Sequence, residues 1–196
     1  MILGARTDVT HRSMTVNLGP TDGSSIAHIE KNPQADGLGY NPRCLRRDIR
    51  PAAAALTTFQ HIYDLIVNSD NKYWFDLGLD GELPNQNLGL HGGGHYTFGV
   101  DPGGDFYMSP GDPMFWLHHA AIDWVWWIWQ TQDLERRLYT PGYAYSRTIT
   151  MLNDPPSRNG TLDDVYGMGM LGMGMRQAEM MTTLGGMEGQ ACYLYA

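Results

Sequence analysis

Residues 112–130 read DPMFWLHHAAIDWVWWIWQ, and this stretch decides the fold that we expect. Its opening Asp112 and Pro113 are an N-cap and a first-turn proline, so the pattern predicts a helix that runs to about Leu138. Apolar side chains occupy several faces of this helix, which indicates burial on most sides. Two adjacent histidines in its middle are candidates for a functional site.

Weaker patterns predict three more helices. Apolar residues recur at near-helical spacing from Ile49 to Val67, with Asp48 and Pro51 as start signals. A shorter helix is expected over Leu88–Tyr96, although three consecutive glycines inside it each cost about 1 kcal/mol relative to Ala. A third is expected over Arg176–Leu184. Long loops rich in Gly and Pro join these segments, and strands are marginal, so the fold class is mainly α.

The composition excludes several classes of partner. The 196 residues contain 13 Lys+Arg and 21 Asp+Glu, a net charge of −8, and nucleic acid binding requires clustered basic residues instead. No apolar run reaches the 18 or so residues that span a membrane, and the opening residues lack the apolar centre of a signal peptide. We therefore expect neither a nucleic acid nor a membrane as partner.

Two cysteines, Cys44 and Cys192, lie near opposite ends of the chain. They are either unrelated thiols or a single bridge, which would stabilise the fold by about 4–5 kcal/mol in the chain-entropy model. The absence of a Cys-x-x-Cys pair excludes a zinc ribbon or thioredoxin-type site. A possible bridge and the sequon Asn159-Gly160-Thr161 favour an oxidising compartment.

Four of the seven histidines fall between positions 91 and 119 and suggest a metal site. His91 and His95 are four residues apart, which places both rings on one helix face. We expect His119 as the third ligand, with Asp123 one turn later holding its ring and His118 in a supporting role. Three neutral nitrogen ligands suit Cu or Zn and leave a coordination position open.

Two other interpretations of these histidines are weaker. A zinc protease needs Glu directly after the first histidine, where this chain has Gly92. A mononuclear zinc or copper hydrolase needs a carboxylate base beside the same pair, and none is present. The remaining histidines are interpreted as ordinary polar residues: His11, His28 and His61.

The stretch LHGGGH followed by DPMFWLHHAAIDWVWWIWQ resembles the second copper-binding motif of the tyrosinase family. That family includes tyrosinases, catechol oxidases and the oxygen-carrying molluscan haemocyanin units. DPMFWLHHAAID is similar to its Asp-Pro-x-Phe-x-x-His-His-x-x-x-Asp signature, and IWQ to its continuation. NPRCLRRD, PPSRNGTLDDV and TLGGMEGQACYLY resemble segments of short secreted fungal tyrosinases. The resemblance runs from about Met14 to Tyr195.

The resemblance implies a helical type-3 copper bundle in which His91, His95 and His119 bind the second copper, called CuB. It implies oxidation of o-diphenols to o-quinones by O2, with copper supplying the redox chemistry. The phenolic substrate and O2 are the small-molecule partners implied.

The resemblance also implies features outside the copper ligands. It pairs Cys44 with Cys192 in a disulfide and makes Tyr193 and Tyr195 the tyrosine motif that closes the catalytic domain. It further implies secretion, with the signal peptide outside this chain.

The three histidines of the family's first copper site, CuA, are absent upstream of this motif. We therefore interpret residues 1–196 as a single partial domain, the CuB-bearing half of a tyrosinase central domain, with one copper per chain. Activity would then require a chain that carries CuA. The alternative is a non-catalytic, mononuclear copper-binding or haemocyanin-like member.

Two positions depart from the family pattern. Gly92 stands where many monophenol-hydroxylating members have Asn, which favours diphenol over monophenol oxidation. Trp124 stands where many members have Arg. Like Trp126, Trp127 and Trp129, it is interpreted as a packing residue.

Seven of the twelve methionines lie between Met168 and Met187. Thioethers are soft ligands that select Cu(I), so the run MGMLGMGM at 168–175 could bind it. Because the family resemblance passes through this segment, we favour the ordinary interpretation that these side chains fill gaps in a core.

Overall fold

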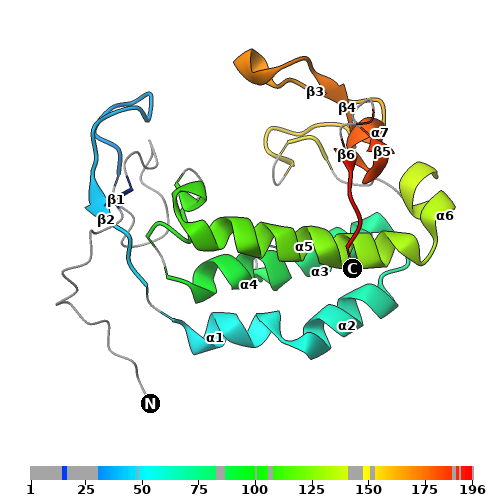
Figure 1. Ribbon diagram of the computed structural model, residues 1–196, viewed down its shortest axis with the longest axis horizontal. Helices are drawn as coiled ribbons and strands as arrows, with labels where there is room; N and C mark the ends of the chain where they lie inside the picture. The colour runs from blue at the N-terminus through cyan, green and yellow to red at the C-terminus, as the bar shows by residue number, and fades with distance from the viewer. Residues whose placement is uncertain are drawn as a thin grey trace. The chain divides into compact units, whose positions relative to one another are not determined.

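The computed structural model describes residues 15–16, 31–47, 49–82, 87–99, 101–105, 108–140, 148–150, 153–186, 189 and 191–195. Within these residues the chain is mainly α-helical, as predicted, with short antiparallel strand pairs (Figure 1). The helices are α1 (Pro51–Ala54), α2 (Phe59–Asn68), α3 (Lys72–Asp80), α4 (Gly89–Thr97), α5 (Pro113–Thr131), α6 (Leu134–Tyr139) and α7 (Gln177–Met180), with 3₁₀ turns η1 (Ala55–Thr57), η3 (Ser109–Gly111) and η5 (Gly169–Leu171).

The strands form three pairs, β1–β2, β3–β4 and β5–β6. Their bounds are β1 (Thr15–Val16), β2 (Arg43–Cys44), β3 (Val165–Tyr166), β4 (Met175–Arg176), β5 (Leu184–Gly186) and β6 (Ala191–Cys192). Each strand is only two or three residues long. Pairs this short contribute little to stability by themselves, so helix packing supports the fold.

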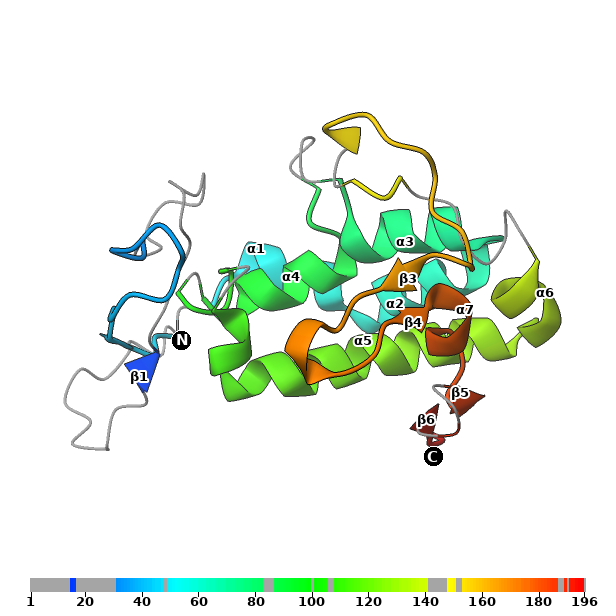
Figure 2. The same cartoon turned by 90° about the horizontal axis from the view of Figure 1, so that it is seen from above.

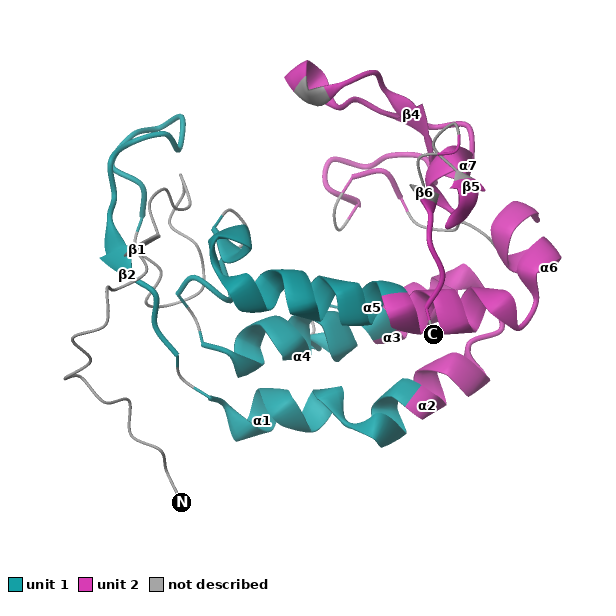
Figure 3. Ribbon diagram, in the orientation of Figure 1, with its two compact units in different colours: residues 1–62, 79–123 teal, residues 63–78, 124–196 magenta. Residues whose placement is uncertain are grey.

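The chain divides into two compact units, coloured separately in Figure 3. Unit 1 contains residues 1–62 and 79–123, and unit 2 contains residues 63–78 and 124–196. Helices α2, α3 and α5 each run from one unit into the other. All four histidines between positions 91 and 119 belong to unit 1.

The helix predicted over Ile49–Val67 is interrupted in the structure. It is divided into α1 with η1 and then α2, because Thr58 adopts an extended conformation between them. The Thr58 hydroxyl accepts a hydrogen bond from the His61 backbone N–H at 3.4 Å, which is an N-cap contact for α2. The continuous apolar spacing therefore gave no indication that Thr58 ends one helix and caps the next. The proposed start signal Asp48 lies outside the described residues.

Helix α4 forms despite its three consecutive glycines. A Cβ atom on Gly93 would lie 2.8 Å from Leu56 Cβ and 3.2 Å from the Ala53 carbonyl oxygen, so glycine permits α1 and η1 to pack closely on α4. Tertiary packing thus compensates for the unfavourable helix propensity of glycine. The predicted helix at Leu88–Tyr96 is confirmed with bounds shifted by one residue.

Helix α5 starts where its sequence predicts. The Asp112 carboxylate accepts a hydrogen bond from the Met114 N–H at 2.9 Å and also pairs with the Arg47 guanidinium. The helix ends at Thr131, however, and not near Leu138. The Arg137 guanidinium donates to the Trp129 carbonyl and lies 4.4 Å from the centroid of the Trp129 ring, so it satisfies an end carbonyl of α5 from the separate helix α6.

The burial predicted around all of α5 is wrong for its first turns. Trp116 and Leu117 are exposed, and the Trp116 indole N–H donates to the Pro110 carbonyl at 3.1 Å. Further along the helix, in unit 2, Trp129 is fully buried and stacks on Phe75 with centroids 4.6 Å apart. The apolar character of α5 therefore supports a core only in its second half.

Helix α3 was not expected from the sequence. The Asn71 side-chain oxygen caps it by accepting from the Trp74 N–H at 3.2 Å, and Lys72 pairs with Asp76 one turn later at 2.5 Å. Its last residue is Asp80. The short helix predicted over Arg176–Leu184 is shorter in the structure, where α7 ends at Met180. None of the described helices is long and apolar enough to cross a membrane.

Candidate metal centre

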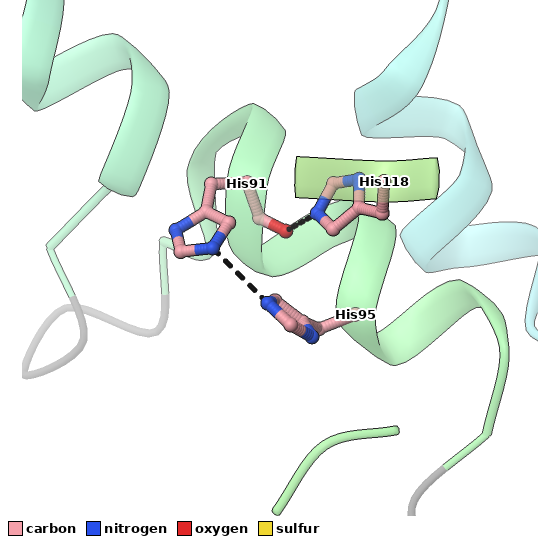
Figure 4. A group of neighbouring side chains, drawn as sticks. All are labelled: His91, His95 and His118. Atoms are coloured by element: carbon pink, nitrogen blue, oxygen red, sulfur yellow. Dashed lines mark hydrogen bonds between the residues drawn. The ribbon is translucent and has the colours of Figure 1, made fainter. Parts of the chain in front are cut away.

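Three imidazole nitrogens converge between α4 and α5 in unit 1. The Nε2 atom of His95 lies 3.0 Å from that of His91 and 3.1 Å from that of His119. The remaining separation, between His91 and His119, is 3.4 Å. Figure 4 shows the rings of His91 and His95, which come from one face of α4, directed toward each other. The spacing of four residues places both on the same side of the helix.

The hydrogen bonds of the other ring nitrogens identify the tautomers. His91 Nδ1 lies 3.1 Å from the Asp80 carboxylate, and His95 Nδ1 lies 2.9 Å from the Gly103 carbonyl. Because these oxygens accept hydrogen bonds, we assign a proton to Nδ1 of each ring. With these protons on Nδ1, the Nε2 atoms of two neutral imidazoles would face each other as acceptors across 3.0 Å. A cation bound by both would remove this repulsion, so the donor set fits a metal ion.

His118 lies beside this triangle and makes a different contact. Its Nε2 is 2.8 Å from the His91 carbonyl oxygen, to which it donates (Figure 4). Its ring stacks on that of His91 with centroids 5.6 Å apart. One nitrogen each of His91, His95 and His118 also fall within 4.8 Å of one another. The triangle completed by His119 is tighter, and the hydrogen bond to the backbone occupies the Nε2 of His118, so we favour His119 as the third ligand.

Neighbouring residues hold the rings of α5 in place. A Cβ atom on Gly94 would lie 2.0 Å from His118 Cε1, so the last glycine of HGGGH provides the space for the His118 ring. Phe115, one turn before His119, stacks on that ring with centroids 4.0 Å apart. Asp123 lies one turn after His119 in α5, and its predicted role of holding the His119 ring stays a prediction.

Sequence reasoning missed Asp80 and the Gly103 carbonyl, which contact the two α4 histidines. Asp80 ends a helix that the sequence patterns did not reveal. Gly103 lies in a turn of DPGGD, and a backbone carbonyl carries no signal in the sequence. The Lys72–Asp76 spacing and the Asn71 cap could have indicated α3, and therefore a carboxylate near its end.

Burial favours the neutral form of His95, His118 and His119. Desolvation, with the nearby rings of His91 and His118, lowers the pKa of His95 to about 3. Desolvation also lowers the pKa of His118 to about 4 and lowers that of His119. Metal binding requires unprotonated imidazole, so protons do not compete effectively for His95 near neutral pH.

The other residues singled out from sequence lie away from the triangle or are not described. His61 is exposed on α2, where its Nδ1 lies 2.6 Å from the Thr58 hydroxyl. His11 and His28 lie outside the described residues. In unit 2, Tyr195 makes edge contacts with the rings of Trp127 and Tyr193, at 5.8 and 5.7 Å.

The cysteines are not bridged in the structure. Cys44 ends β2 in unit 1, Cys192 ends β6 in unit 2, and both are exposed. The disulfide implied by the family resemblance is therefore not observed and stays a prediction.

Comparison with known proteins agrees with the histidine pattern. Residues 4–132 match the model of the common central domain of tyrosinase. The tyrosinase-like protein orsC of Emericella nidulans is 41% identical over 128 residues, which cover 64% of this chain and 31% of the relative. The N-acetyl-6-hydroxytryptophan oxidase ivoB of the same organism is 30% identical over 196 residues, which cover 98% of this chain and 52% of the relative.

A solved structure extends the similarity to three dimensions. A polyphenol oxidase from Thermothelomyces thermophila, a Gly-to-Asn mutant, is 37% identical with a TM-score of 0.77, and the match covers 94% of this chain. It covers 49% of the polyphenol oxidase chain, so this protein spans about half the length of that structure and of ivoB. From the matched central domain, which includes the converging histidines, we conclude that the chain belongs to the tyrosinase family.

Proposed function

We propose that this chain is the CuB-bearing half of a tyrosinase-type phenol oxidase. One copper is bound by the Nε2 atoms of His91, His95 and His119. The observation that carries the proposal is the convergence of the Nε2 atoms of His91, His95 and His119, which lie 3.0–3.4 Å from one another. Neutral imidazoles are common ligands for copper.

The residues around the copper ligands fix their orientation. The Asp80 carboxylate and the Gly103 carbonyl hold the α4 rings through Nδ1, which directs both Nε2 atoms to the same point. His118 joins α5 to the His91 backbone, and Phe115 limits rotation of the His119 ring. Contacts of this kind position a ligand and raise its basicity. Bound copper supplies the redox chemistry that these side chains lack.

The reaction we propose is oxidation of an o-diphenol to an o-quinone by O2. Two diphenol molecules each lose two phenolic protons and an electron pair, and one O2 accepts the four electrons and four protons and is reduced to two molecules of water. In the relatives' family this chemistry uses two copper sites, and the CuB triangle is one of them. We propose that the CuA site is provided by polypeptide outside these 196 residues. Gly92, beside the first ligand, favours diphenols over monophenols.

Copper binding by the full chain tests the ligand set. Elemental analysis of the purified chain, loaded with Cu(II) in the absence of a reductant, should give one copper per chain, because imidazoles bind Cu(II) whereas thioethers select Cu(I). His119→Ala should abolish that copper, His118→Ala should only weaken binding, and His61→Ala, which changes an exposed histidine, should have no effect. Equal losses from the His118 and His119 variants would contradict the assignment, and two Cu(II) ions per chain under these conditions would contradict the half-site.

Activity requires a second experiment. The chain alone, loaded with copper, should not oxidise catechol. Co-expression with the CuA-containing part of a tyrosinase-family relative should produce quinone, and the His119→Ala chain should not support it. Copper binding without quinone formation in the mixture would reject the oxidase proposal and favour the alternative of a non-catalytic copper-binding or haemocyanin-like protein.

We also propose secretion and the pairing of Cys44 with Cys192, in keeping with the sequon at Asn159. Because both side chains are exposed, an alkylating reagent would label them as free thiols. If the bridge forms, alkylation under non-reducing conditions should modify neither. Labelling of both thiols in protein secreted from a fungal host would reject the bridge.

A further inference from the structure

The methionine-rich run at residues 168–175 lies in a hairpin of unit 2. Strands β3 and β4 pair antiparallel, with Val165 opposite Arg176 and Tyr166 opposite Met175. The segment between them forms the turn and includes η5 (Figure 2). Four methionines at alternate or near-alternate positions therefore lie in one short hairpin: Met168, Met170, Met173 and Met175.

The exposure of the turn methionines distinguishes them from the methionines that pack in a core. Met181 and Met108 are 2% and 8% exposed, as expected for side chains that fill gaps between helices. Met170 and Met173, by contrast, are 104% and 88% exposed. Core packing, the interpretation that the sequence favoured, therefore does not explain the two methionines of the turn. An exposed turn ordinarily carries polar residues, so these thioethers need another explanation.

Glycines give the hairpin the freedom to bring its thioethers together. A Cβ atom at Gly167, Gly169 or Gly172 would meet no other atom within 4 Å, so packing does not require glycine there. Gly169 has a φ of +55°, a conformation that side chains disfavour. Gly174, next to β4, is packed, since its Cβ atom would lie 2.8 Å from Val165 Cγ1. The turn at residues 167–172 lacks such contacts at its glycines, so it can rearrange around a bound ion at small cost, and the methionine side chain adds three rotatable bonds.

We propose that the hairpin is a Cu(I) site whose ligands are the thioether sulfurs of the methionines at 168, 170, 173 and 175. Thioethers are soft, uncharged ligands that select Cu(I) over Zn²⁺ and over hard cations such as Mg²⁺ and Ca²⁺. The site involves no redox step, because a cuprous ion binds and leaves in the same oxidation state. It is separate from the histidine triangle, which lies in unit 1, and it does not depend on the proposed oxidase activity.

The thioether chemistry predicts a distinctive pH dependence. A thioether has no proton to lose, so Cu(I) binding at the hairpin should change little between about pH 5 and pH 7. Sites built from imidazole or thiol ligands must lose protons to bind the metal, so their affinity decreases as the pH decreases.

The proposal can be tested on the full chain with Cu(I) added under anaerobic, reducing conditions. NMR of protein labelled with ¹³C at the methionine methyl groups reports each thioether separately. Cu(I) should shift the methyl signals of Met170 and Met173, whereas those of the buried Met108 and Met181 should stay in place. The same titration with Zn²⁺ should shift none of the hairpin signals.

Substitution supplies the affinity measurement. In competition with a chromophoric Cu(I) chelator, a chain with both Met170→Leu and Met173→Leu should bind Cu(I) at the hairpin at least about tenfold more weakly, because Leu conserves volume without a ligand atom. Met180→Leu, in α7, is the matched control and should bind as the wild type does. The His119→Ala background removes the imidazole contribution.

Hairpin methyl signals that do not respond to Cu(I), or a double variant with wild-type affinity in the His119→Ala background, would overturn the proposal. A response of the hairpin that persists when His119→Ala abolishes the copper at the triangle would support it. Failure of the histidine site and failure of the hairpin site are therefore observed separately.

Discussion

The three glycines between His91 and His95 provide a matched series, because each lies inside α4 but faces different atoms. Replacing any of them by Ala should gain about 0.8–1 kcal/mol in helix propensity. The Cβ atom on Gly92 would lie 3.2 Å from Cβ of Leu88, the N-cap residue of α4, which is a tight contact. We expect Gly92→Ala to stabilise the chain by up to roughly 1 kcal/mol.

Gly94→Ala should act in the opposite direction. Its Cβ would lie 2.0 Å from Cε1 and 2.5 Å from both nitrogens of the His118 ring. The ring cannot move without losing its 2.8 Å hydrogen bond to the His91 carbonyl. Overpacking costs about 1–3 kcal/mol, and a lost hydrogen bond costs about 0.5–1.5 kcal/mol. After the propensity gain, we expect a net loss of about 0.5–3.5 kcal/mol.

Urea unfolding and copper titration of the two variants measure these effects. Gly94→Ala should lower the urea midpoint and weaken copper binding, because displacement of His118 disturbs the backbone of His91. Gly92→Ala should bind copper as the wild type does. Similar stability and copper affinity for the two variants would refute the argument that Gly94 provides the space for the His118 ring.

Three further perturbations test the surroundings of the site. Asp80→Leu should weaken copper binding about 10–100-fold in isothermal titration calorimetry, because Asp80 orients a metal ligand. Unchanged affinity would show that its 3.1 Å contact with His91 does not orient the ring. Arg43→Met should lower the free energy of unfolding by about 3–5 kcal/mol, because it leaves the buried Asp101 without the guanidinium 2.8 Å away; a urea midpoint within error of the wild type would contradict this. Hydrogen bonds from Arg158 and from the Thr161 backbone lower the pKa of Asp164 to about 2, so the stabilisation from this carboxylate should be present above about pH 4 and lost as pH falls through about 2. NMR titration should show a higher Asp164 pKa in Arg158→Met, and an unchanged pKa would exclude Arg158 as the cause.

The main helix could be predicted from sequence because its start signals are local. Asp112 and Pro113 are adjacent, and both act within the first turn of α5. The end of α5 could not be predicted, since it depends on Arg137 reaching back to the Trp129 carbonyl from another helix. Likewise, the break at Thr58 is encoded by one side-chain hydroxyl within a continuous apolar pattern. Helix ends determined by tertiary or single side-chain contacts leave no periodic signal.

The candidate metal ligands and the residues that orient them were unequally visible in the sequence. His91 and His95 share a helix face by spacing alone, and His118 and His119 stand in a recognisable motif. Asp80 lies eleven residues before His91 and contacts it only because α3 ends nearby. The Gly103 carbonyl has no side-chain identity at all. Sequence patterns thus identified the residue types of the ligands, whereas the residues that orient the rings were identified only from the structure.

The location of these contacts bears on whether the proposed CuB half-domain can bind copper by itself. The three Nε2 atoms and their partners Asp80 and Gly103 all belong to unit 1. Each ring is oriented by contacts within residues 80–119, and none of these contacts requires a second copper site. A site preorganised in this way loses little conformational entropy when the ion binds. We therefore expect copper affinity to be a property of this chain, whereas phenol oxidation depends on polypeptide beyond it.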